Sequence, residues 1–407
     1  MALARTPGAR RAAVAALALT LALALQPLAA ARAAVLDNDY VGGVQVKARE
    51  ALRTAAPDLS MPSGLLSTMD GRELWSRDPA ARRAMASTTK IMTAVVVLER
   101  LSVDTTVTVD RKAAVVGQSS MGLVVGETFT IGELLKGVLI QSGNDAATLA
   151  AERVGGTVAD FIRLMNQKAA ALDLVNTHYA NPHGLDQAGH YTSAQDLTSL
   201  ARYAMRNPVF RRIVGTYTVK VRSDRYTHSL TNHNSLLKSY KGAEGVKTGW
   251  TDDAGYCVVA AAERGGVELI GTVMGAASEG DRSKQAKRLL DWGFKHYKPV
   301  AVASSGEVLG RVPVSDYLER TVAASAAEAT TVAVFDLAGP VQHRVELLAD
   351  VPAPVKAGDR VGTLTVYQGK SMLAQIPLVA DRDVPAPSFG QRVIFFFARI
   401  WRGIFGN

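Results

Sequence analysis

Three short motifs rich in serine and lysine follow one another along the chain, and their residue types suit acyl transfer through a serine. They are Ser87-Thr88-Thr89-Lys90, Ser142-Gly143-Asn144 and Lys247-Thr248-Gly249. A serine hydroxyl is a weak nucleophile and needs a base to activate it. A lysine can be that base only when burial and a nearby cation lower its pKa to about 7–8. The pattern therefore predicts that Lys90 takes the proton of Ser87 and that Lys247 supplies the cation.

The first motif opens a strongly apolar stretch that is typical of a helix and runs to Arg100. On a helix, Ser87 and Lys90 would share one face, and the helix dipole would favour negative charge at the serine. Taken alone, Ser87 would be an ordinary helix cap. A second Ser-x-x-Lys pattern at residues 235–238 shows how easily the motif arises by chance. No long apolar helix follows Ser235, so Ser87 is the predicted nucleophile.

The other two motifs supply polar groups for a substrate. The hydroxyl of Ser142 can relay a proton, and the amide of Asn144 can hold a peptide group. Lys247 offers a point charge for a carboxylate, Thr248 adds a hydrogen bond, and Gly249 lets a substrate lie close to the backbone. Alone, these two motifs would be a turn between helices and a solvated turn. Their combination and order with the first motif favour catalysis.

The elements around the motifs predict a mixed α/β domain. Hydrophobic periodicity and capping residues indicate helices over residues 86–100, 131–140, 145–153, 158–172, 191–205 and 283–295. Two early strands are expected over 63–67 and 73–76, and two late ones over 255–264 and 267–273. Gly265-Gly266 suits a hairpin between the late strands, so the sheet should be antiparallel there.

From about residue 300 the segments become short and β-branched, with Gly, Pro or Asp between them, which indicates a small all-β domain. Strands are expected over 307–314, 330–335, 342–348 and 362–367. Residues 381–388 read as a stiff extended linker because of their prolines.

The last segment, residues 389–407, is amphipathic when drawn as a helix. One side carries Arg392, Arg399 and Arg402; the other carries Val393, Phe396, Phe397, Ile400, Trp401 and Ile404, and Phe395 breaks the pattern. Three arginines make a membrane-spanning helix costly. A helix lying in the membrane interface fits better, and the alternative is a helix that docks on its own protein.

The N-terminal residues 1–33 resemble a secretory signal peptide. Arg5, Arg10 and Arg11 precede an apolar run over 12–25 and Ala-x-Ala patterns. The run is shorter than the roughly 20 residues of a membrane span, so cleavage is favoured over an anchor. An exported protein with the single cysteine Cys257 has no internal disulfide. Cys257 stands in an apolar run and is expected to be a buried thiol.

The chain has 407 residues and a formal net charge of +9, with 48% hydrophobic and 20% charged residues. This composition is globular and long enough for two domains. The basic residues are scattered, without an arginine-rich arm or an aromatic ladder, which argues against nucleic-acid binding. A basic surface would suit an anionic substrate or an anionic membrane.

Together the motifs resemble those of the low-molecular-mass penicillin-binding proteins that act as D-alanyl-D-alanine carboxypeptidases. The resemblance covers about residues 65–294 and rests on residues 87–93, 141–146, 181–186 with 190–194, and 245–256. It implies a DD-peptidase/β-lactamase-like α/β (α+β) catalytic domain with an antiparallel sheet and a helical subdomain. The expected division is a signal peptide (1–33), the catalytic domain (34–298), an all-β domain (299–380), a linker (381–388) and an anchoring helix (389–407).

The resemblance also implies roles for individual residues, without a metal or other cofactor. Ser87 would attack the carbonyl between two terminal D-alanines of a peptidoglycan stem peptide, and β-lactams would acylate it. The backbone N–H groups of Ser87 and Trp250 would form the oxyanion hole. Asn144, Thr248 and Gly249 would line the substrate, Lys247 would assist charge and proton flow, and Ser142 would relay the proton. By spacing, Arg282 would bind the substrate carboxylate from a loop, where the alternative is a solvated arginine.

Two residues depart from the family pattern. Met85 stands where proline is common, and Trp250 where histidine is frequent, which bears on substrate preference. His183, with His190 and Asp196 downstream, could suggest a metal site or a triad. Residues 181–184 are interpreted instead as a hydrogen-bonded structural turn, because neither zinc-ligand spacing nor a nucleophile elbow is present.

Three other functions share parts of this evidence. A class A β-lactamase has the same fold and motifs but needs a deacylating glutamate, and no Glu-x-x-x-Asn lies between the second and third motifs. A DD-endopeptidase acting on cross-links would use the same residues. A non-catalytic wall-binding scaffold would not need the intact set of motifs. The expected location is the outer face of the cytoplasmic membrane or the periplasm.

Overall fold

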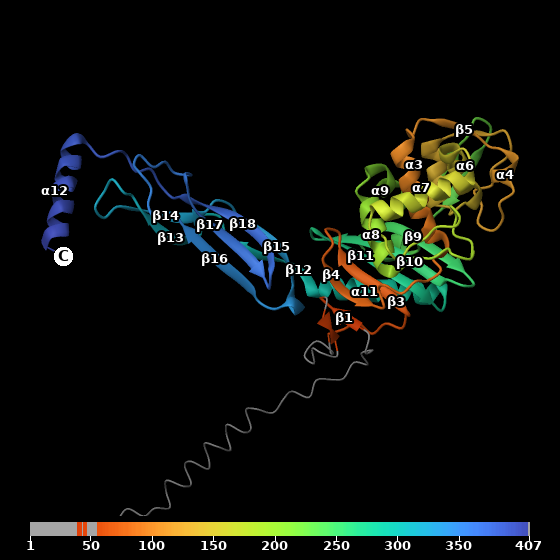
Figure 1. Cartoon of the computed structure of the whole chain (residues 1–407), viewed down its shortest axis with the longest axis horizontal. Coiled ribbons are helices and arrows are strands. Elements are labelled where there is room, and N and C mark those ends of the chain that lie inside the picture. The colour runs from red at the N-terminus through yellow and green to blue at the C-terminus, as the bar shows by residue number, and fades with distance from the viewer. Residues whose placement is uncertain (1–38, 43, 47–54, 406–407) are drawn as a thin grey trace, which may run out of the picture.

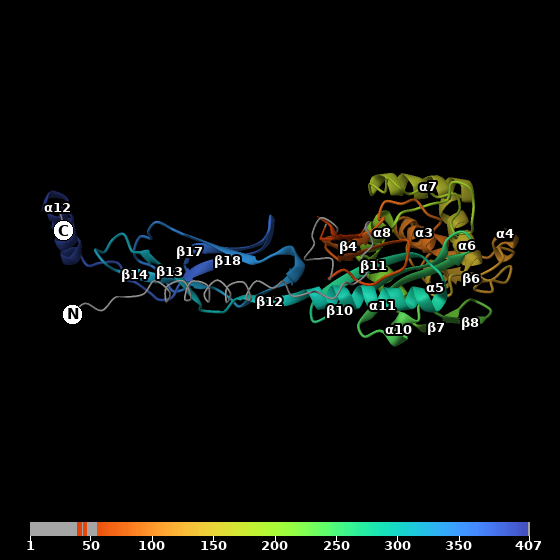
Figure 2. The same ribbon diagram turned by 90° about the horizontal axis from the view of Figure 1, so that it is seen from below.

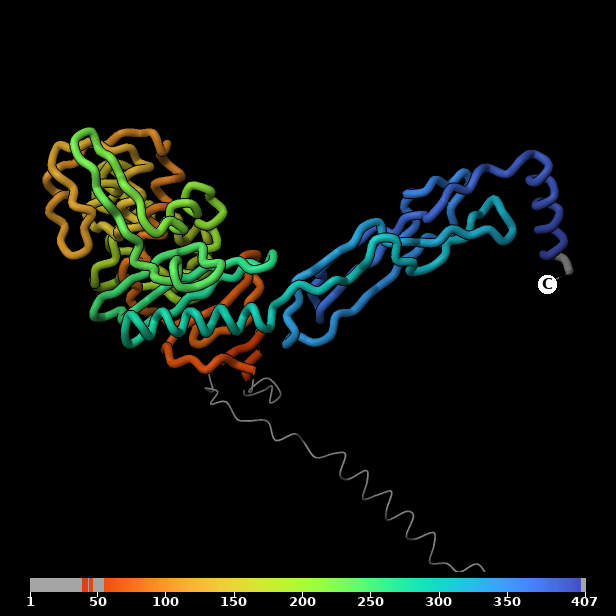
Figure 3. Tube along the Cα trace, turned by 180° about the vertical axis from the view of Figure 1, so that it is seen from behind, coloured from red at the N-terminus to blue at the C-terminus, as the bar shows by residue number. Residues whose placement is uncertain are grey.

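The computed structural model describes residues 39–42, 44–46 and 55–405. The predicted signal peptide lies outside these residues. Figures 1 and 2 show a catalytic domain of helices and sheet, a β domain beside it, and a helix at the C-terminal end of an elongated molecule. Figure 3 shows that the chain leaves the catalytic domain through one long helix and enters the β domain directly.

A seven-stranded antiparallel sheet forms the centre of the catalytic domain. Its order is β2-β1-β4-β3-β11-β10-β9. The bounds are β1 (Asp39–Val41), β2 (Val44–Gln45), β3 (Ser63–Thr68), β4 (Glu73–Arg77), β9 (Ala243–Thr251), β10 (Gly255–Arg264) and β11 (Val267–Ala276). The two predicted early strands and the hairpin at Gly265-Gly266 are confirmed. Strand β9, which carries the third motif, is an edge strand of this sheet.

Helices cover both faces of the sheet. Helix α11 (Glu279–His296) packs on one face, and α8 (Ala194–Met205) on the other (Figure 2). The α8 face continues into a helical region with α3 (Lys90–Arg100), α4 (Arg111–Ala114), α5 (Ile131–Leu139), α6 (Asn144–Gly155), α7 (Val158–Ala171) and α9 (Pro208–Val214). Residues 90–97 of α3 are all buried. A helix that is apolar almost all round must lie inside the domain, and α3 buries the lysine of the first motif together with its apolar residues.

Capping side chains set where several of these helices begin. Thr130, Thr157 and Ser193 accept hydrogen bonds from the backbone N–H three residues later. The prediction that Thr192 or Ser193 caps the helix near 191–205 is therefore confirmed for Ser193. The sequence did not predict the shorter elements, because their strands are mostly polar and their helices brief. These are β5 (Thr106–Thr108), β6 (Thr128–Thr130), β7 (Thr218–Arg222), β8 (Thr227–Thr231) and α10 (Leu236–Ser239), together with β1, β2, α4 and α9.

The β domain contains the predicted strands and three more. A two-stranded pair joins β12 (Tyr297–Ala303) to β15 (Thr330–Phe335). A five-stranded sheet holds β13 (Val308–Pro313), β14 (Thr321–Ala326), β18 (Ser371–Ala380), β17 (Arg360–Gln368) and β16 (Val341–Leu347) in that order. The Arg72 side chain donates to Gln368 Oε1 at 2.8 Å, and the ring of Trp292 meets that of Phe335 edge-on at 5.8 Å. These contacts join the β domain to the catalytic domain.

The segment expected to be a linker packs partly on the β domain. Val384 is buried in the core of that domain and pairs with Val355. The hydroxyl of Tyr317 donates to the carbonyl oxygen of Pro385 at 2.8 Å. The segment is extended, as its prolines predict, but burial of the Val384 side chain holds it against the strands.

One side of helix α12 (Phe389–Phe405) contacts the β domain. The Arg402 guanidinium lies 2.7 Å from Glu319, Arg399 donates to the carbonyl oxygen of Ser315, and the ring of Phe395 meets that of Tyr317. Phe395 breaks the apolar stripe because it belongs to the side that contacts the β domain. The exposed apolar side chains of the helix are Phe389, Val393, Ile394, Phe396, Phe397, Ile400 and Trp401.

Within the part of the chain that the structure describes, no helix has both the length and the apolar character that crossing a membrane requires.

Candidate active site

Ser87 lies in a tight turn that precedes α3. The predicted helix over 86–100 begins as the 3-10 turn η2 (Ala86–Thr89) and becomes α-helical at Lys90. Ala86 adopts φ +48°, a left-handed conformation that costs a residue with a side chain about 1–3 kcal/mol. Such a conformation persists only where neighbours hold it.

A buried histidine holds this turn. The Thr89 hydroxyl donates to the Ala86 carbonyl at 2.8 Å and lies 2.8 Å from His190 Nε2. His190 Nδ1 accepts from the Ala180 N–H at 3.0 Å, so the proton of the neutral ring is on Nε2 and points to Thr89. Burial lowers the pKa of His190 to about 4, which keeps the ring neutral. The histidine thus fixes the backbone immediately before the nucleophile.

The side chain of Lys90 is directed by three acceptors. Its Nζ lies 2.9 Å from Ser87 Oγ, 2.7 Å from Asn144 Oδ1 and 2.7 Å from the carbonyl oxygen of His183. Two of these partners, the amide and backbone oxygens, can only accept. A neutral amine has two N–H bonds, which these two oxygens occupy, so its lone pair must face the serine hydroxyl. The geometry therefore suits Lys90 as the base.

The electrostatics of Lys90 favour the neutral amine. Burial is the main cause that holds its pKa well below the usual value, the positive charge of Lys247 lowers it further, and Asp145 opposes the shift. These are the conditions under which a lysine acts as a base near neutral pH.

The second motif lies at the start of α6. The Asn144 side chain donates to the Gly117 carbonyl oxygen at 3.0 Å, which orients its amide oxygen toward Lys90. The sequence predicted that this amide holds the substrate, whereas in the structure its oxygen holds the base. Ser142 has φ +62° in the turn between α5 and α6, and it lines the cavity beside Ser87.

The third motif runs along the edge strand β9. Lys247 is buried beneath the cavity and does not line it, and its Nζ donates to the Thr248 carbonyl at 2.9 Å. Burial first, and then the nearby cation of Arg282, lower the pKa of Lys247 to about 7. Thr248 and Gly249 line the cavity. A Cβ on Gly249 would lie 2.8 Å from the Ser87 nitrogen, so this position requires glycine.

An aromatic and cationic wall follows the third motif. The exposed fraction of Trp250 is 52%, and its ring lies 5.8 Å from that of Tyr256. The guanidinium carbon of Arg282 lies 5.7 Å from the centre of the same tyrosine ring. Arg282 also contacts Glu279 at 3.0 Å. Tyr256 thus connects the two residues, although the sequence did not single it out.

The predicted environment of Arg282 was wrong in one respect. It does not stand in a loop before a helix at 283: α11 begins at Glu279, because the Ser278 hydroxyl accepts from the Asp281 N–H at 3.1 Å. Arg282 is therefore in the first turn of the helix. It is 4% exposed, so it is not a solvated arginine, and it borders the cavity.

All these elements enclose one cavity of about 510 Å³. Seven of the nine predicted site residues line it, and Lys90 and Lys247 lie buried beneath. The cavity is also lined by residues that the sequence did not predict: Gln118, Ser119, Gly184, Leu185, His233, Thr251, Tyr256 and Glu279. No motif signals most of these, because they come from loops and from the starts of other elements.

The turn at residues 181–186 positions an acceptor for the Lys90 amine. Asn181 Oδ1 accepts from the Gly184 N–H at 2.6 Å, and its amide donates to the Leu185 carbonyl at 2.9 Å. This arrangement presents the His183 carbonyl to Lys90. Burial is the main cause that lowers the pKa of the His183 ring to about 3, so the ring is neutral. Among the described residues, no group of three or more His, Cys, Asp and Glu side chains is placed to hold a metal ion.

The two rival nucleophiles have no catalytic surroundings. Ser235 is exposed at the start of α10, and its hydroxyl lies 3.3 Å from that of Ser283. The amine of Lys238 sits over the ring of Tyr217, at 4.2 Å from its centre. Cys257 is buried in β10, and burial raises the pKa of its thiol to about 11. The prediction of a buried strand thiol is confirmed.

Known proteins resemble the chain over both domains. The family model described as D-alanyl-D-alanine carboxypeptidase matches residues 53–278, and that of the penicillin-binding protein 5 C-terminal domain matches 297–386. The D-alanyl-D-alanine carboxypeptidase DacF of Bacillus subtilis is 31% identical over 80% of this chain and 86% of its own length. DacC of Escherichia coli is 31% identical over 83% of this chain and 85% of its own.

Solved structures agree with these relatives. A mutant of the Streptomyces K15 DD-transpeptidase is 36% identical, covers 59% of this chain and all of its own, and has a TM-score of 0.58. The D-alanyl-D-alanine carboxypeptidase DacD of Francisella tularensis is 28% identical, covers 81% of this chain and 94% of its own, and has a TM-score of 0.60. With its serine, its two buried lysines and its matched β domain, the chain belongs to the D-alanyl-D-alanine carboxypeptidase family.

Proposed function

We propose that Ser87 is the nucleophile with which this serine D-Ala-D-Ala carboxypeptidase removes the terminal D-alanine from peptidoglycan stem peptides. The observation that carries the proposal is the Lys90 amine, 2.9 Å from Ser87 Oγ, with its other two contacts on carbonyl-type oxygens. Lys90 takes the hydroxyl proton while Ser87 Oγ bonds to the carbonyl carbon between the two D-alanines. The substrate C–N bond then breaks, and an acyl-enzyme remains on Ser87.

The other residues act on charge and proton movement. The backbone N–H groups of Ser87 and Trp250 stabilise the oxyanion. Such electrostatic stabilisation is often the largest single contribution to the rate enhancement. Ser142 passes the proton to the departing D-alanine nitrogen. Arg282 binds the substrate carboxylate as a planar, bidentate donor. Water then hydrolyses the acyl-enzyme and frees Ser87.

Asn144 and the third motif complete the proposed site. Asn144 orients Lys90 through its oxygen and offers its remaining N–H bond to the substrate. Thr248 and Gly249 line the bound peptide along the β9 edge, and Lys247 keeps a positive charge beneath it. No metal or other cofactor has a part in these steps.

The test is release of D-alanine from a peptide that ends in D-Ala-D-Ala. The wild type should release it and form a covalent adduct with labelled penicillin on Ser87, and Ser87→Ala should do neither. D-Alanine release by Ser87→Ala, or label on Ser235, would contradict the mechanism. Cross-link cleavage and penicillin turnover, measured on the same preparation, would identify endopeptidase or β-lactamase activity. A glycine acceptor would reveal transfer, the reaction for which the Streptomyces relative is named.

We also propose that α12 attaches the protein to a membrane surface. Seven apolar side chains of α12 are 41–84% exposed: Phe389, Val393, Ile394, Phe396, Phe397, Ile400 and Trp401. The contacts with the β domain come from Arg402, Arg399 and Phe395, on the arginine side of the helix. An exposed apolar stripe beside basic residues is typical of helices that lie in a membrane interface.

Flotation with anionic vesicles would test this attachment. Deletion of residues 388–407, or Phe396→Ser with Phe397→Ser, should leave the protein in solution and D-alanine release intact. Continued flotation of the deletion variant would disprove it. We propose further that the protein is exported through a cleaved signal peptide (1–33). Its proposed parts are the catalytic domain (34–298), the all-β domain (299–380), the linker (381–388) and the anchoring helix (389–407).

A further inference from the structure

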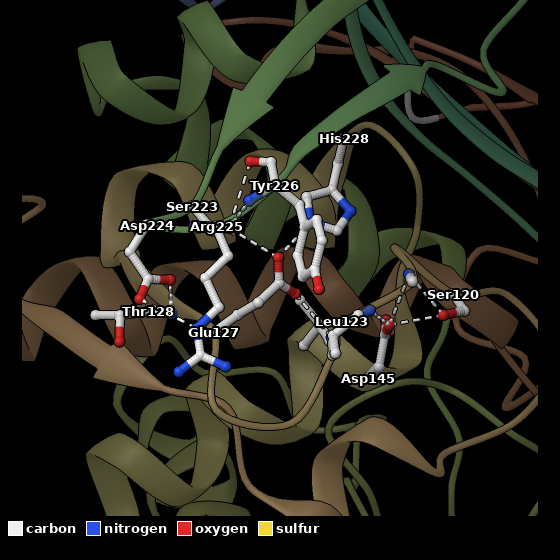
Figure 4. A network of polar contacts seen from close by, with 12 residues as sticks. Ser120, Leu123, Glu127, Thr128, Asp145, Ser223, Asp224, Arg225, Tyr226 and His228 are labelled. Atoms are coloured by element: carbon white, nitrogen blue, oxygen red, sulfur yellow. Dashed lines mark hydrogen bonds and ion pairs between the residues drawn. The ribbon is translucent and has the colours of Figure 1, made fainter.

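A buried carboxylate outside the three motifs holds the end of a loop that contributes Gln118 and Ser119 to the cavity. Glu127 is fully buried, and it accepts three hydrogen bonds (Figure 4). Its Oε2 accepts from the Val124 N–H at 2.7 Å, and its Oε1 accepts from Ser223 Oγ at 2.7 Å and from His228 Nε2 at 2.9 Å. No step of the proposed reaction uses this group.

The three bonds join segments that are far apart in the sequence. Glu127 directly precedes β6, whereas Ser223 and His228 belong to the β7–β8 hairpin about 100 residues later. The Thr128 N–H donates to Asp224 Oδ1 at 2.7 Å and strengthens the same junction. We call Glu127, Ser223 and His228 the hairpin clamp. It fixes the end of the preceding loop, residues 117–124, to the hairpin.

A second carboxylate holds the middle of that loop. Asp145 Oδ1 accepts from the Met121 N–H at 2.9 Å, and Oδ2 accepts from Ser120 Oγ at 2.6 Å and from the Gly122 and Leu123 N–H groups at 3.0 and 3.2 Å (Figure 4). Asp145 follows Asn144 in α6. The loop is therefore suspended between α6 and the hairpin by two buried acids.

This loop reaches the catalytic residues by two routes. Gln118 and Ser119 line the cavity. The Gly117 carbonyl accepts from the Asn144 amide at 3.0 Å, and Asn144 in turn accepts from Lys90 at 2.7 Å. A shift of the loop would change both the cavity wall and the direction of the Lys90 amine.

Hydrogen bonds, more than apolar packing, hold the end of the loop at the clamp. Val124 and Val125 are 45% and 52% exposed. Burial alone would raise the pKa of Glu127, but the hydrogen bonds from Val124, His228 and Ser223 outweigh it and lower the pKa, so the group is a carboxylate at neutral pH. A carboxylate is the side chain that can accept from all three donors at once.

We propose that Glu127 is a positioning residue for acylation, because the hairpin clamp holds residues 117–124 where they orient Asn144 and Lys90 and close the cavity wall. The inference rests on the proposed function, since it concerns acylation of Ser87. It predicts that loss of the clamp slows each active molecule, and does not merely reduce the number of folded molecules.

The experiment counts active sites with labelled penicillin and measures D-alanine release and the acylation rate per titrated Ser87. Glu127→Ala should lower both about tenfold, since a misplacement of about 1 Å can cost roughly a hundredfold and the loop keeps its bonds to Asp145. Glu127→Gln should recover most of the loss, because its amide oxygen can still accept from the Val124 N–H. The matched control is Asp39→Ala, which removes a buried carboxylate bound to Arg77 at 2.6 Å on β1, across the sheet from β9. It should lower the melting temperature without changing the rate per site.

Wild-type rates per titrated site in Glu127→Ala would overturn the proposal, as would an equal loss in Asp39→Ala. If Glu127→Ala does not fold, His228→Phe is the deciding variant. It keeps a ring against Phe129, now 5.5 Å away, and deletes one donor to the carboxylate. A loss of about threefold per site is expected, and no loss would overturn the proposal. Failure of the proposed function would appear separately, as a wild type that neither binds penicillin nor releases D-alanine.

Discussion

Gly249→Ala tests the proximity of strand β9 to the nucleophile. A Cβ at this position would lie 2.8 Å from the Ser87 nitrogen, 3.1 Å from the Thr88 nitrogen and 2.9 Å from Ala86 Cβ. Ordinary contacts begin near 3.4 Å. Two of the three atoms are backbone, so the turn that carries Ser87 must move by about half an ångström, since it cannot rotate away as a side chain would.

The expected loss of acylation rate follows from displacement of the Ser87 backbone. The Ser87 N–H is half of the proposed oxyanion hole, and loss of one such donor costs about 10²–10³ in rate. A partial displacement should therefore lower the acylation rate about 100-fold, which corresponds to about 2.7 kcal/mol in the activation free energy. Overpacking should also lower the free energy of unfolding by about 1–3 kcal/mol. The fold should survive, because the added volume is one methyl group.

The assay is the rate of acylation by a fluorescent penicillin, with thermal unfolding followed on the same samples. Gly271→Ala is the control, because its Cβ would meet Leu289 Cδ2 at 3.1 Å on the buried side of β11. That contact is a flexible side-chain end, so this variant should keep the wild-type acylation rate. A Gly249→Ala protein that acylates as fast as the wild type would refute the placement of β9 against Ser87.

Three further predictions concern Lys247, Lys90 and the rival nucleophile Ser235. The acylation rate should fall as pH rises through about 7, where Lys247 loses its proton. Arg282→Gln should move this fall to higher pH, because the charge of Arg282 lowers the pKa of Lys247. A pH–rate profile that is the same in Arg282→Gln and the wild type would contradict this coupling. Asn144→Leu should slow acylation about 10–100-fold, since one N–H of Lys90 loses its acceptor and the lone pair is no longer directed at the serine. Wild-type acylation by Asn144→Leu would show that the amide does not orient the base. Ser235→Ala should leave D-alanine release unchanged, because the hydroxyl of this exposed serine lies against that of Ser283, while the Lys238 amine lies over the ring of Tyr217.

The elements that the sequence predicted well have strong local signals. Helix α7 has the cap Thr157 and a clear apolar period, and the β10–β11 hairpin has Gly265-Gly266 at its turn. The linker was less accurate, because prolines indicate extended backbone but not what the chain packs on. Burial of Val384 was decided by strands that lie far away in the sequence.

Several site residues had no comparable signal. Tyr256 is one of many aromatic residues in strands, and nothing local marks it as the support of Arg282. Glu127 is separated by about 100 residues from two of its partners. His190 acts through Thr89 on the backbone of Ala86, and no spacing rule connects these three positions.

The sequence by itself determined the chemistry available to this protein. Serine and lysine three residues apart at a helix start, together with the two later motifs, specify a nucleophile, a base and a cation, because residue type sets which atoms can donate, accept or attack. Only the tertiary structure decided what lowers the pKa of each lysine. Burial and the approach of β9 to η2 place Lys247 near Lys90 and Arg282 near Lys247, and charges affect each other's pKa through distance and dielectric, which no spacing along the chain contains. The orientation of the Lys90 lone pair likewise depends on Asn144 and His183, which the fold alone brings to it.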